Sequence, residues 1–224
     1  MNRKLLAVLA MVLIAVMFLA ACRGGTTPEV PAGPETTPDS GVTVPEESTG
    51  PVRGVWVGNV YTNGYLGFRF TMPEVWSAAT DAELADLMGV FEGALPDLME
   101  EFTVFYEMVA TSPTGASIQV IIERMEDPAL LTLTEAELIE MMVPYMEQMG
   151  VILDVNSPVT RIGRYDWHSY RTSWAGEAPI EARIPYGQQF IMIRDGFVHY
   201  IIFSFGVETE SVAGMLAMFG DLGA

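Results

Sequence analysis

Cysteine and histidine, the residue types most typical of catalytic thiols, catalytic bases and zinc sites, are scarce in this chain. Its 224 residues contain one cysteine, Cys22, and two histidines, His168 and His199. A catalytic thiol needs a base beside it in a folded pocket, but Cys22 is followed by a polar, proline-rich segment. A disulfide would need a second cysteine in the chain. Cys22 therefore requires another explanation, and we expect both histidines to pack within strands, with His168 partly exposed.

After Lys4 the chain has no lysine, and its remaining cationic residues are arginines. That removes Schiff-base chemistry, the phosphate-binding P-loop and the usual basic patch of nucleic-acid-binding proteins. No stretch has the spacing of a zinc site, a calcium loop or a nucleophile elbow. We expect a protein that is not an enzyme and has no cofactor, no metal and no nucleic-acid partner.

The residues before Cys22 have the organisation of a secretory signal. Residues 2–4 form a short cationic start, and residues 5–19 are fifteen apolar residues in a row. Such a run suits a signal peptide and is short for a membrane-spanning helix, which needs about 20 apolar residues. The run ends in an aliphatic residue, two alanines and Cys22.

Residues 19–22 resemble a bacterial lipobox. The resemblance implies that the sulfur of Cys22 carries a diacylglyceryl group and that a peptidase cuts before this residue. Each lipid CH₂ buried in a bilayer contributes about 0.8 kcal/mol, so two or three acyl chains would hold the protein at the extracytoplasmic face of the cell membrane. The alternative is an ordinary cleaved signal peptide with an incidental cysteine.

We expect three segments: a signal peptide (1–21), a lipidated cysteine with a disordered tether (22–52) and one globular domain (53–224). The tether is rich in Pro, Thr, Gly and Glu and lacks a periodic apolar face, so it cannot offset the entropy of ordering. Its one arginine and five carboxylates favour holding the domain away from an anionic membrane.

Turn and capping signals divide the domain into strands and helices. Asn63-Gly64 predicts a two-residue hairpin turn between strands at 55–61 and 65–72. Capping boxes predict two helix starts, and Pro144 predicts a kink or break in the second helix. The capping pairs are Thr80 with Glu83 and Thr134 with Glu137. The other predicted elements are strands at 102–110, 118–124, 159–162, 165–174, 181–194 and 197–205, and a short helix containing Val212, Met215, Leu216 and Phe219.

Asp195-Gly196 is the most informative turn signal, because a two-residue turn there fixes a register. It places Met192 opposite His199 and Phe190 opposite Ile201. Both faces of the resulting hairpin are apolar, so it should lie in the middle of a sheet that is covered on both sides. The predicted fold class is α+β, with a mainly antiparallel β-sheet flanked by helices on both faces.

The start of the domain resembles PsbP-like α/β/α sandwich domains. The residues that carry this resemblance are Asn63, Leu66, Gly67, Phe68, Pro73 and Trp76, with further similarity at 159–163, Trp167 and the long terminal hairpin. The resemblance covers about 54–219 and implies an accessory, assembly or binding role. The matching positions are turn and packing residues, so it implies no catalytic residue.

Charge is unevenly distributed along the domain. Residues 74–154 carry 17 carboxylates and one arginine, whereas residues 155–224 carry seven carboxylates and five arginines. We interpret the acidic part as a solubilising surface that repels anionic lipid and wall polymers. The alternative is a docking face for a basic partner or for loosely held cations.

The predicted strand 165–174 is a candidate binding surface. Alternation places His168, Tyr170 and Trp174 on one face, with Trp167 and Arg171 on the other. Exposed aromatic side chains with a polar edge would suit a glycan or a peptide. The alternative is an aromatic face that belongs to the core.

These features predict a membrane-anchored extracytoplasmic lipoprotein that binds or helps assemble another surface component. The alternative function is a module that binds a small ligand or a glycan for transport or sensing. A pocket with convergent polar groups would favour the small ligand, and a flat apolar or charged patch would favour a protein partner.

Replacing Cys22 with serine tests the anchor. We expect Cys22→Ser to abolish lipid attachment, because serine has no thiol to acylate, and to leave unprocessed precursor or released protein. Membrane fractionation and intact mass measurement report both outcomes. Equal membrane retention of the variant, at the mass expected without lipid in both proteins, would contradict lipidation.

Overall fold

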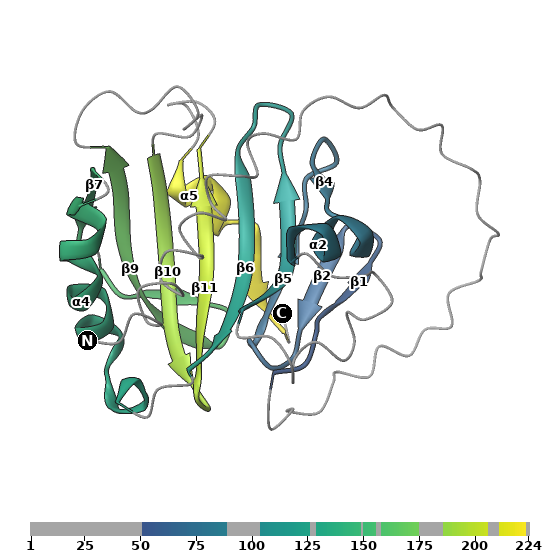
Figure 1. Ribbon diagram of the computed structural model, residues 1–224. Coiled ribbons are helices and arrows are strands. Elements are labelled where there is room, and N and C mark those ends of the chain that lie inside the picture. Colours follow the sequence, from purple (N-terminus) through teal and green to yellow (C-terminus); the bar gives the residue numbers. More distant parts are fainter. Residues whose placement is uncertain are drawn as a thin grey trace.

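The computed structural model describes residues 51–88, 104–125, 129–148, 150–155, 158–174, 186–205 and 211–222. Cys22, the predicted signal peptide and nearly all of the tether lie outside the described residues. The described elements are three α-helices, one 3₁₀ helix and twelve strands arranged in two antiparallel sheets (Figure 1). In chain order they are β1 (Val55–Val57), β2 (Val60–Asn63), β3 (Phe68–Thr71), β4 (Ser77–Ala78), α2 (Asp81–Met88), β5 (Val104–Thr111), β6 (Ser117–Arg124), η2 (Leu130–Thr132), α4 (Glu135–Gln148), β7 (Val151–Asp154), β8 (Thr160–Ile162), β9 (Tyr165–Trp174), β10 (Tyr186–Arg194), β11 (Phe197–Ser204), α5 (Val212–Leu216) and β12 (Phe219–Asp221).

The hairpin of β10 and β11 lies at the middle of the large sheet, as its two apolar faces predict. The strand order is β4-β5-β6-β11-β10-β9-β7, with β8 paired to β9. The register places Met192 opposite His199 and Phe190 opposite Ile201, so the predicted pairing is confirmed.

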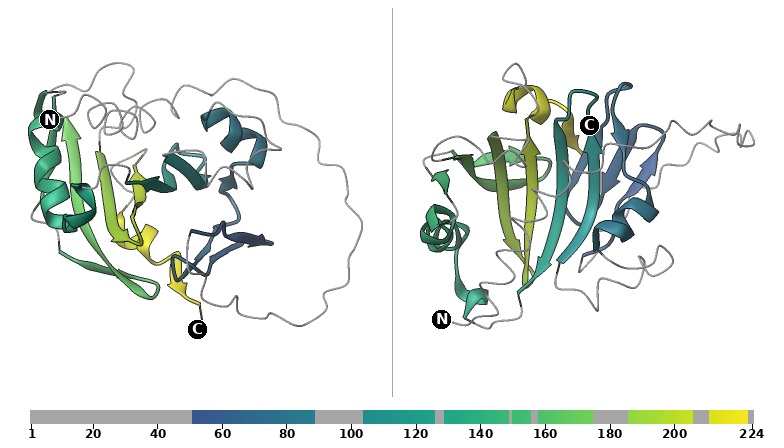
Figure 2. Two further views of the ribbon diagram at one scale, coloured as in Figure 1. Left: turned by 60° about the horizontal axis from the view of Figure 1, so that its bottom comes forward. Right: turned by 45° about the horizontal axis from the view of Figure 1, so that its top comes forward.

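Each face of this hairpin belongs to a different hydrophobic cluster. Phe190, Ile201 and Phe203 pack with β2, β3, Trp167 and α5, whereas Ile191, Val198 and Ile202 pack with α2 and α4. Helix α2 and the small sheet lie on opposite sides of β5 and β6 (Figure 2, left). The predicted α+β class with helices on both faces is confirmed, and a second sheet, which the sequence pattern did not predict, shares one face with α5.

The small sheet has the strand order β1-β2-β3-β12. The predicted two-residue turn at Asn63-Gly64 is wrong, because Asn63 pairs with Phe68 and residues 64–67 form the loop. The side-chain oxygen of Asn63 accepts a hydrogen bond from Leu66 N at 2.7 Å, which stabilises this longer loop. Gly67 has φ 72°, and a Cβ there would lie 2.8 Å from Arg164 Cβ, so the position requires glycine.

Both predicted capping boxes are present. Glu83 accepts a hydrogen bond from Thr80 N at 2.7 Å, and Glu137 accepts one from Thr134 N at 2.8 Å. Helix α4 continues through Pro144 and is not broken there. The predicted C-terminal helix is shorter than expected, because Phe219 belongs to β12 and pairs with Phe70.

A buried carboxyl group, that of Glu107, joins the two sheets. One of its oxygens accepts hydrogen bonds from the Tyr61 hydroxyl, from Gly54 N and, at 2.8 Å, from Asn63 Nδ2. Its other oxygen is buried without a partner among the described residues. Burial raises the pKa of Glu107, and the hydrogen bonds from Tyr61 and Gly54 partly oppose that rise.

A second carboxyl group, that of Glu123, lies on the other face of the large sheet. The Tyr200 hydroxyl donates to its Oε2 at 3.2 Å. Burial raises the pKa of Glu123 to about 7, although this hydrogen bond lowers it in part. Two of the carboxylates in the acidic segment, Glu107 and Glu123, are therefore buried in the core and do not contribute to an acidic surface.

The raised pKa of Glu123 predicts that stability falls as pH rises. Between the ordinary pKa of 4.5 and about 7, the folded state keeps a proton that the unfolded state has released. This difference lowers the free energy of unfolding by about 3 kcal/mol over that pH interval. We expect Glu123→Gln to remove this pH-dependent contribution. Its free energy of unfolding, measured with urea, should therefore fall less between pH 5 and pH 8 than that of the unmodified protein.

The control is Glu140→Gln, which neutralises an exposed carboxylate on α4. This variant should keep the pH dependence of the unmodified protein. If the free energy of unfolding of Glu123→Gln changes with pH as steeply as that of the unmodified protein, Glu123 is not the source of the pH dependence.

Candidate functional site

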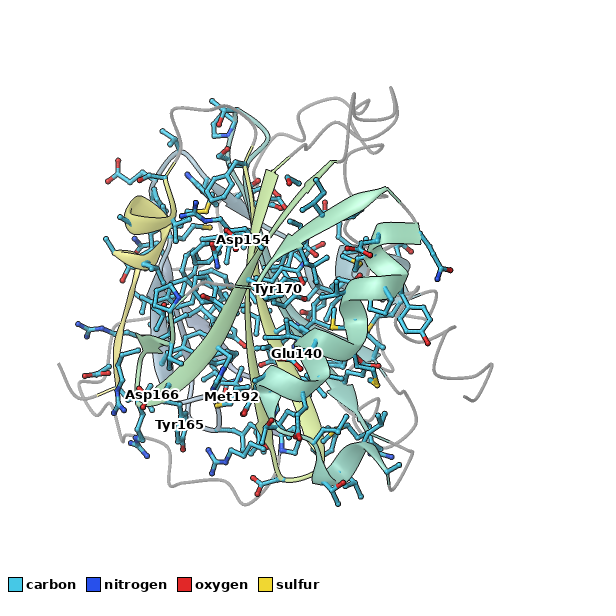
Figure 3. All side chains as sticks on the ribbon, turned by 90° about the vertical axis from the view of Figure 1, so that its left-hand side faces the viewer. Glu140, Asp154, Tyr165, Asp166, Tyr170 and Met192 are labelled. Carbon is cyan, nitrogen blue, oxygen red and sulfur yellow. The ribbon has the colours of Figure 1, made fainter. Side chains whose placement is uncertain are left out.

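The described surface has a groove of about 750 Å³ between the large sheet and α5. It is formed by one end of β9 and β10, the adjoining ends of β7 and β8, and the first residues of α5. In Figure 3, Asp154 and α5 lie toward one end of β9, and Tyr165 and Asp166 lie toward the other. The lining residues are Asp154, Pro158, Thr160, Ser169, Arg171, Thr172, Ser173, Gly187, Gln188, Phe190, Phe205, Ser211, Val212, Ala213 and Leu216.

Strand register determines which side chains face the groove. Gln188 is paired with Arg171, and Phe190 is paired with Ser169. Because side chains two residues apart on a strand share a face, these four residues lie on the same face of the large sheet. Phe190 belongs to the cluster that includes the small sheet and α5, so the groove opens on that side.

The polar part of the groove is organised by Gln188, whose side chain is only 3% exposed. Its Nε2 donates to the carbonyl oxygen of Tyr170 at 3.2 Å, and its Oε1 accepts from Arg171 Nε at 3.1 Å. These two bonds fix the orientation of the amide, since only the nitrogen can donate to a carbonyl and only the oxygen can accept from a guanidinium. Gln188 therefore positions Arg171.

Arg171 differs from the described arginines that form ion pairs with carboxylates. Arg53, Arg161 and Arg194 form ion pairs with Asp81, Asp166 and Asp195. Within the described ranges Arg171 has no ion pair, and its terminal nitrogens have no hydrogen-bond partner. Its guanidinium is exposed at the groove and keeps donors that a ligand could use.

The opposite wall is apolar and comes largely from aromatic residues and α5. Phe190 packs against Phe203 with ring centroids 5.0 Å apart, and Phe205, Val212 and Leu216 complete the wall. The groove thus combines one positioned cation, several hydroxyl groups and an apolar side.

The predicted binding strand is present with the predicted bounds, but its groove-facing side is the other one. Tyr170 is fully buried, and its hydroxyl donates to Gln189 Oε1 at 2.5 Å, so it is a core residue and its assignment to a binding surface is wrong. His168 is partly buried on the same face as Tyr170. The backbone of Trp174 ends β9, and its side chain lies outside the described residues.

The physical reason for this correction is the layer that contains α4. Tyr170 contacts the cluster formed with that helix, which covers the face assigned to His168 and Tyr170. The face assigned to Arg171 instead carries the groove. The polar pair Gln188-Gln189 in a largely apolar strand was a usable signal. The pairing of Gln188 with Arg171, however, depends on the register between β9 and β10, which no turn signal specifies.

The second histidine is packed, as expected. His199 is fully buried, its Nε2 lies 3.4 Å from the Tyr65 hydroxyl, and burial lowers its pKa to about 4. The described residues contain no cluster of three or more metal-ligating side chains. None of the described helices is long and apolar enough to cross a membrane.

Comparisons with known proteins find similarity to solved structures but no match in sequence. No protein-family model matches the chain, and no curated protein matches it in sequence. The solution structure of cyanobacterial PsbP (CyanoP) from Synechocystis sp. PCC 6803 is similar over 77% of this chain and 98% of that one, with a TM-score of 0.42 and 13% identity. The likeness is to the kind of domain that the sequence resembles. The α+β class rests on the strands and helices of this chain.

Proposed function

We propose that this protein is a non-enzymatic binding module, held at the extracytoplasmic face of the cell membrane by lipid on Cys22, and that the groove beside α5 is its ligand site. The lipobox-like residues before Cys22 support the anchor. The tether would place the domain away from the lipid surface, where the groove is open to soluble or surface-bound ligands.

The observation that carries this proposal is the buried amide of Gln188 that positions Arg171. Burying a polar side chain is unfavourable unless its hydrogen bonds are satisfied. Here one bond holds the amide to the carbonyl oxygen of Tyr170, and the other orients the surface cation Arg171. Positioned donors beside an apolar wall are the components of a small-ligand site. This arrangement favours the small-ligand function over a role in assembly.

A protein-docking function has one observation in its favour. Strand β1 is at the edge of the small sheet, and its Val55 and Val57 side chains are 62% and 74% exposed. An edge strand with exposed apolar side chains can pair with a strand of another protein. The assembly role is therefore the second candidate.

Filling the groove separates the two functions. Ala213 is an exposed lining residue of α5, so Ala213→Trp should obstruct the groove at little cost in stability. We expect a screen of small carboxylic acids, amino acids and sugars by ligand-observed NMR, on the full chain in lipid nanodiscs, to find ligands that bind the unmodified protein and no longer bind this variant.

The control is Ala217→Trp, which adds the same side chain at an exposed position near α5 outside the groove lining. It should leave ligand binding unchanged. A screen without ligands, or ligands that bind both variants equally, would overturn the groove as the functional site.

A further inference from the structure

We infer that the groove recognises an organic monoanion, a carboxylate attached to an aromatic or other apolar body. The inference rests on the proposed function, because it names the ligand class of the same groove. It follows from the charge, donors and wall of the groove, each taken in turn below.

The first element is the cation. Arg171 stands in a chain with a net charge of −18, in which a nearby carboxylate is the common partner of an arginine. Its Nε donates to a neutral amide oxygen, and in the described part of the chain the guanidinium forms no ion pair with a carboxylate. A ligand carboxylate would accept from the terminal nitrogens, and hydrogen bonds to charged groups are the stronger ones.

The second element is the number of charges. Asp154 is paired with Arg171 across β7 and β9 and also lines the groove. Among the described lining residues, one side chain is positive and one is negative. A single arginine opposed by an aspartate suits a ligand with one negative charge, whereas a phosphate monoester with a charge near −2 would meet stronger repulsion from Asp154.

The third element is the apolar wall. Phe190 and Phe205 stand on the sheet side, and Val212 and Leu216 stand on the helix side. An aromatic ring placed between them would bury apolar surface and pack against phenylalanine rings. The wall thus selects the body of the ligand, and Arg171 selects its charged end.

Phenylacetate is the probe that contains both parts. We expect the full chain in phosphatidylcholine nanodiscs to bind phenylacetate at least about tenfold more tightly than phenylacetamide, phenethylamine or phenyl phosphate, measured by saturation-transfer NMR titration against empty nanodiscs. Phenylacetamide has the same aromatic body as phenylacetate but no charge, so the ratio of their affinities measures the contribution of the negative charge.

Arg171→Gln should weaken phenylacetate binding by about tenfold or more and leave phenylacetamide binding unchanged. The matched control is Arg161→Gln, which removes an exposed arginine that is paired with Asp166 and lies outside the groove. It should change both affinities by less than about twofold. Thermal unfolding of each variant shows whether the fold is retained.

The possible failures are distinguishable. If phenylacetamide or phenyl phosphate binds as well as phenylacetate, and Ala213→Trp abolishes that binding, the groove is a ligand site but the monoanion assignment is wrong. If phenylacetate binds equally to the unmodified protein, Arg171→Gln and Ala213→Trp, both the assignment and the groove are wrong. A loss of phenylacetate binding in Arg161→Gln equal to that in Arg171→Gln would also overturn the specific role of Arg171.

Discussion

The burial of the β10–β11 hairpin on both faces is the constraint on which the rest of the structure depends. Phe190, Ile201 and Phe203 face one cluster, and Ile191, Val198 and Ile202 face the other. Such a hairpin cannot lie at a surface, because either exposed face would leave large apolar side chains in water. One layer must cover it with α2 and α4, and a second layer must cover it with the small sheet and α5. The remaining strands extend the sheet on either side of this centre.

Polar side chains buried between these layers form hydrogen bonds with specific partners, and one of these partners is a surface residue. Glu107 binds Tyr61, Gly54 and Asn63, which fastens the start of the domain to the large sheet. Gln188 uses the Tyr170 carbonyl and the Arg171 side chain. The hydrogen bonds of Glu107 all lie inside the protein, whereas those of Gln188 extend to Arg171 in the groove. The same requirement, that buried polar groups be hydrogen-bonded, therefore stabilises the fold in one place and positions a surface cation in the other.

Among the described residues, α5 and the small sheet cover part of their face of the large sheet, and the groove lies beside α5. Helix α5 has five residues and contributes its Met215 to the core, and β12 then continues the chain to pair with β3. Arg171 of β9 is paired with Asp154 of β7, and both residues line this groove. The proposed function combines a lipid anchor at Cys22, a tether and this groove, and each part depends on different residues.

The sequence by itself determined the features that depend on neighbouring residues. The turn at Asp195-Gly196 set the hairpin register, the capping boxes set the starts of α2 and α4, and alternation set the bounds of β9. Tertiary structure decided what depends on distant segments: the pairing of β12 with β3, the position of Gln188 opposite Arg171, and the burial of Tyr170 instead of its exposure. Alternation shows that a strand has two faces, but the layer that packs on each face determines which is core and which is surface. That choice places Arg171 in the groove and Tyr170 beneath the layer of α4, because the helix and the small sheet meet the strand from opposite sides.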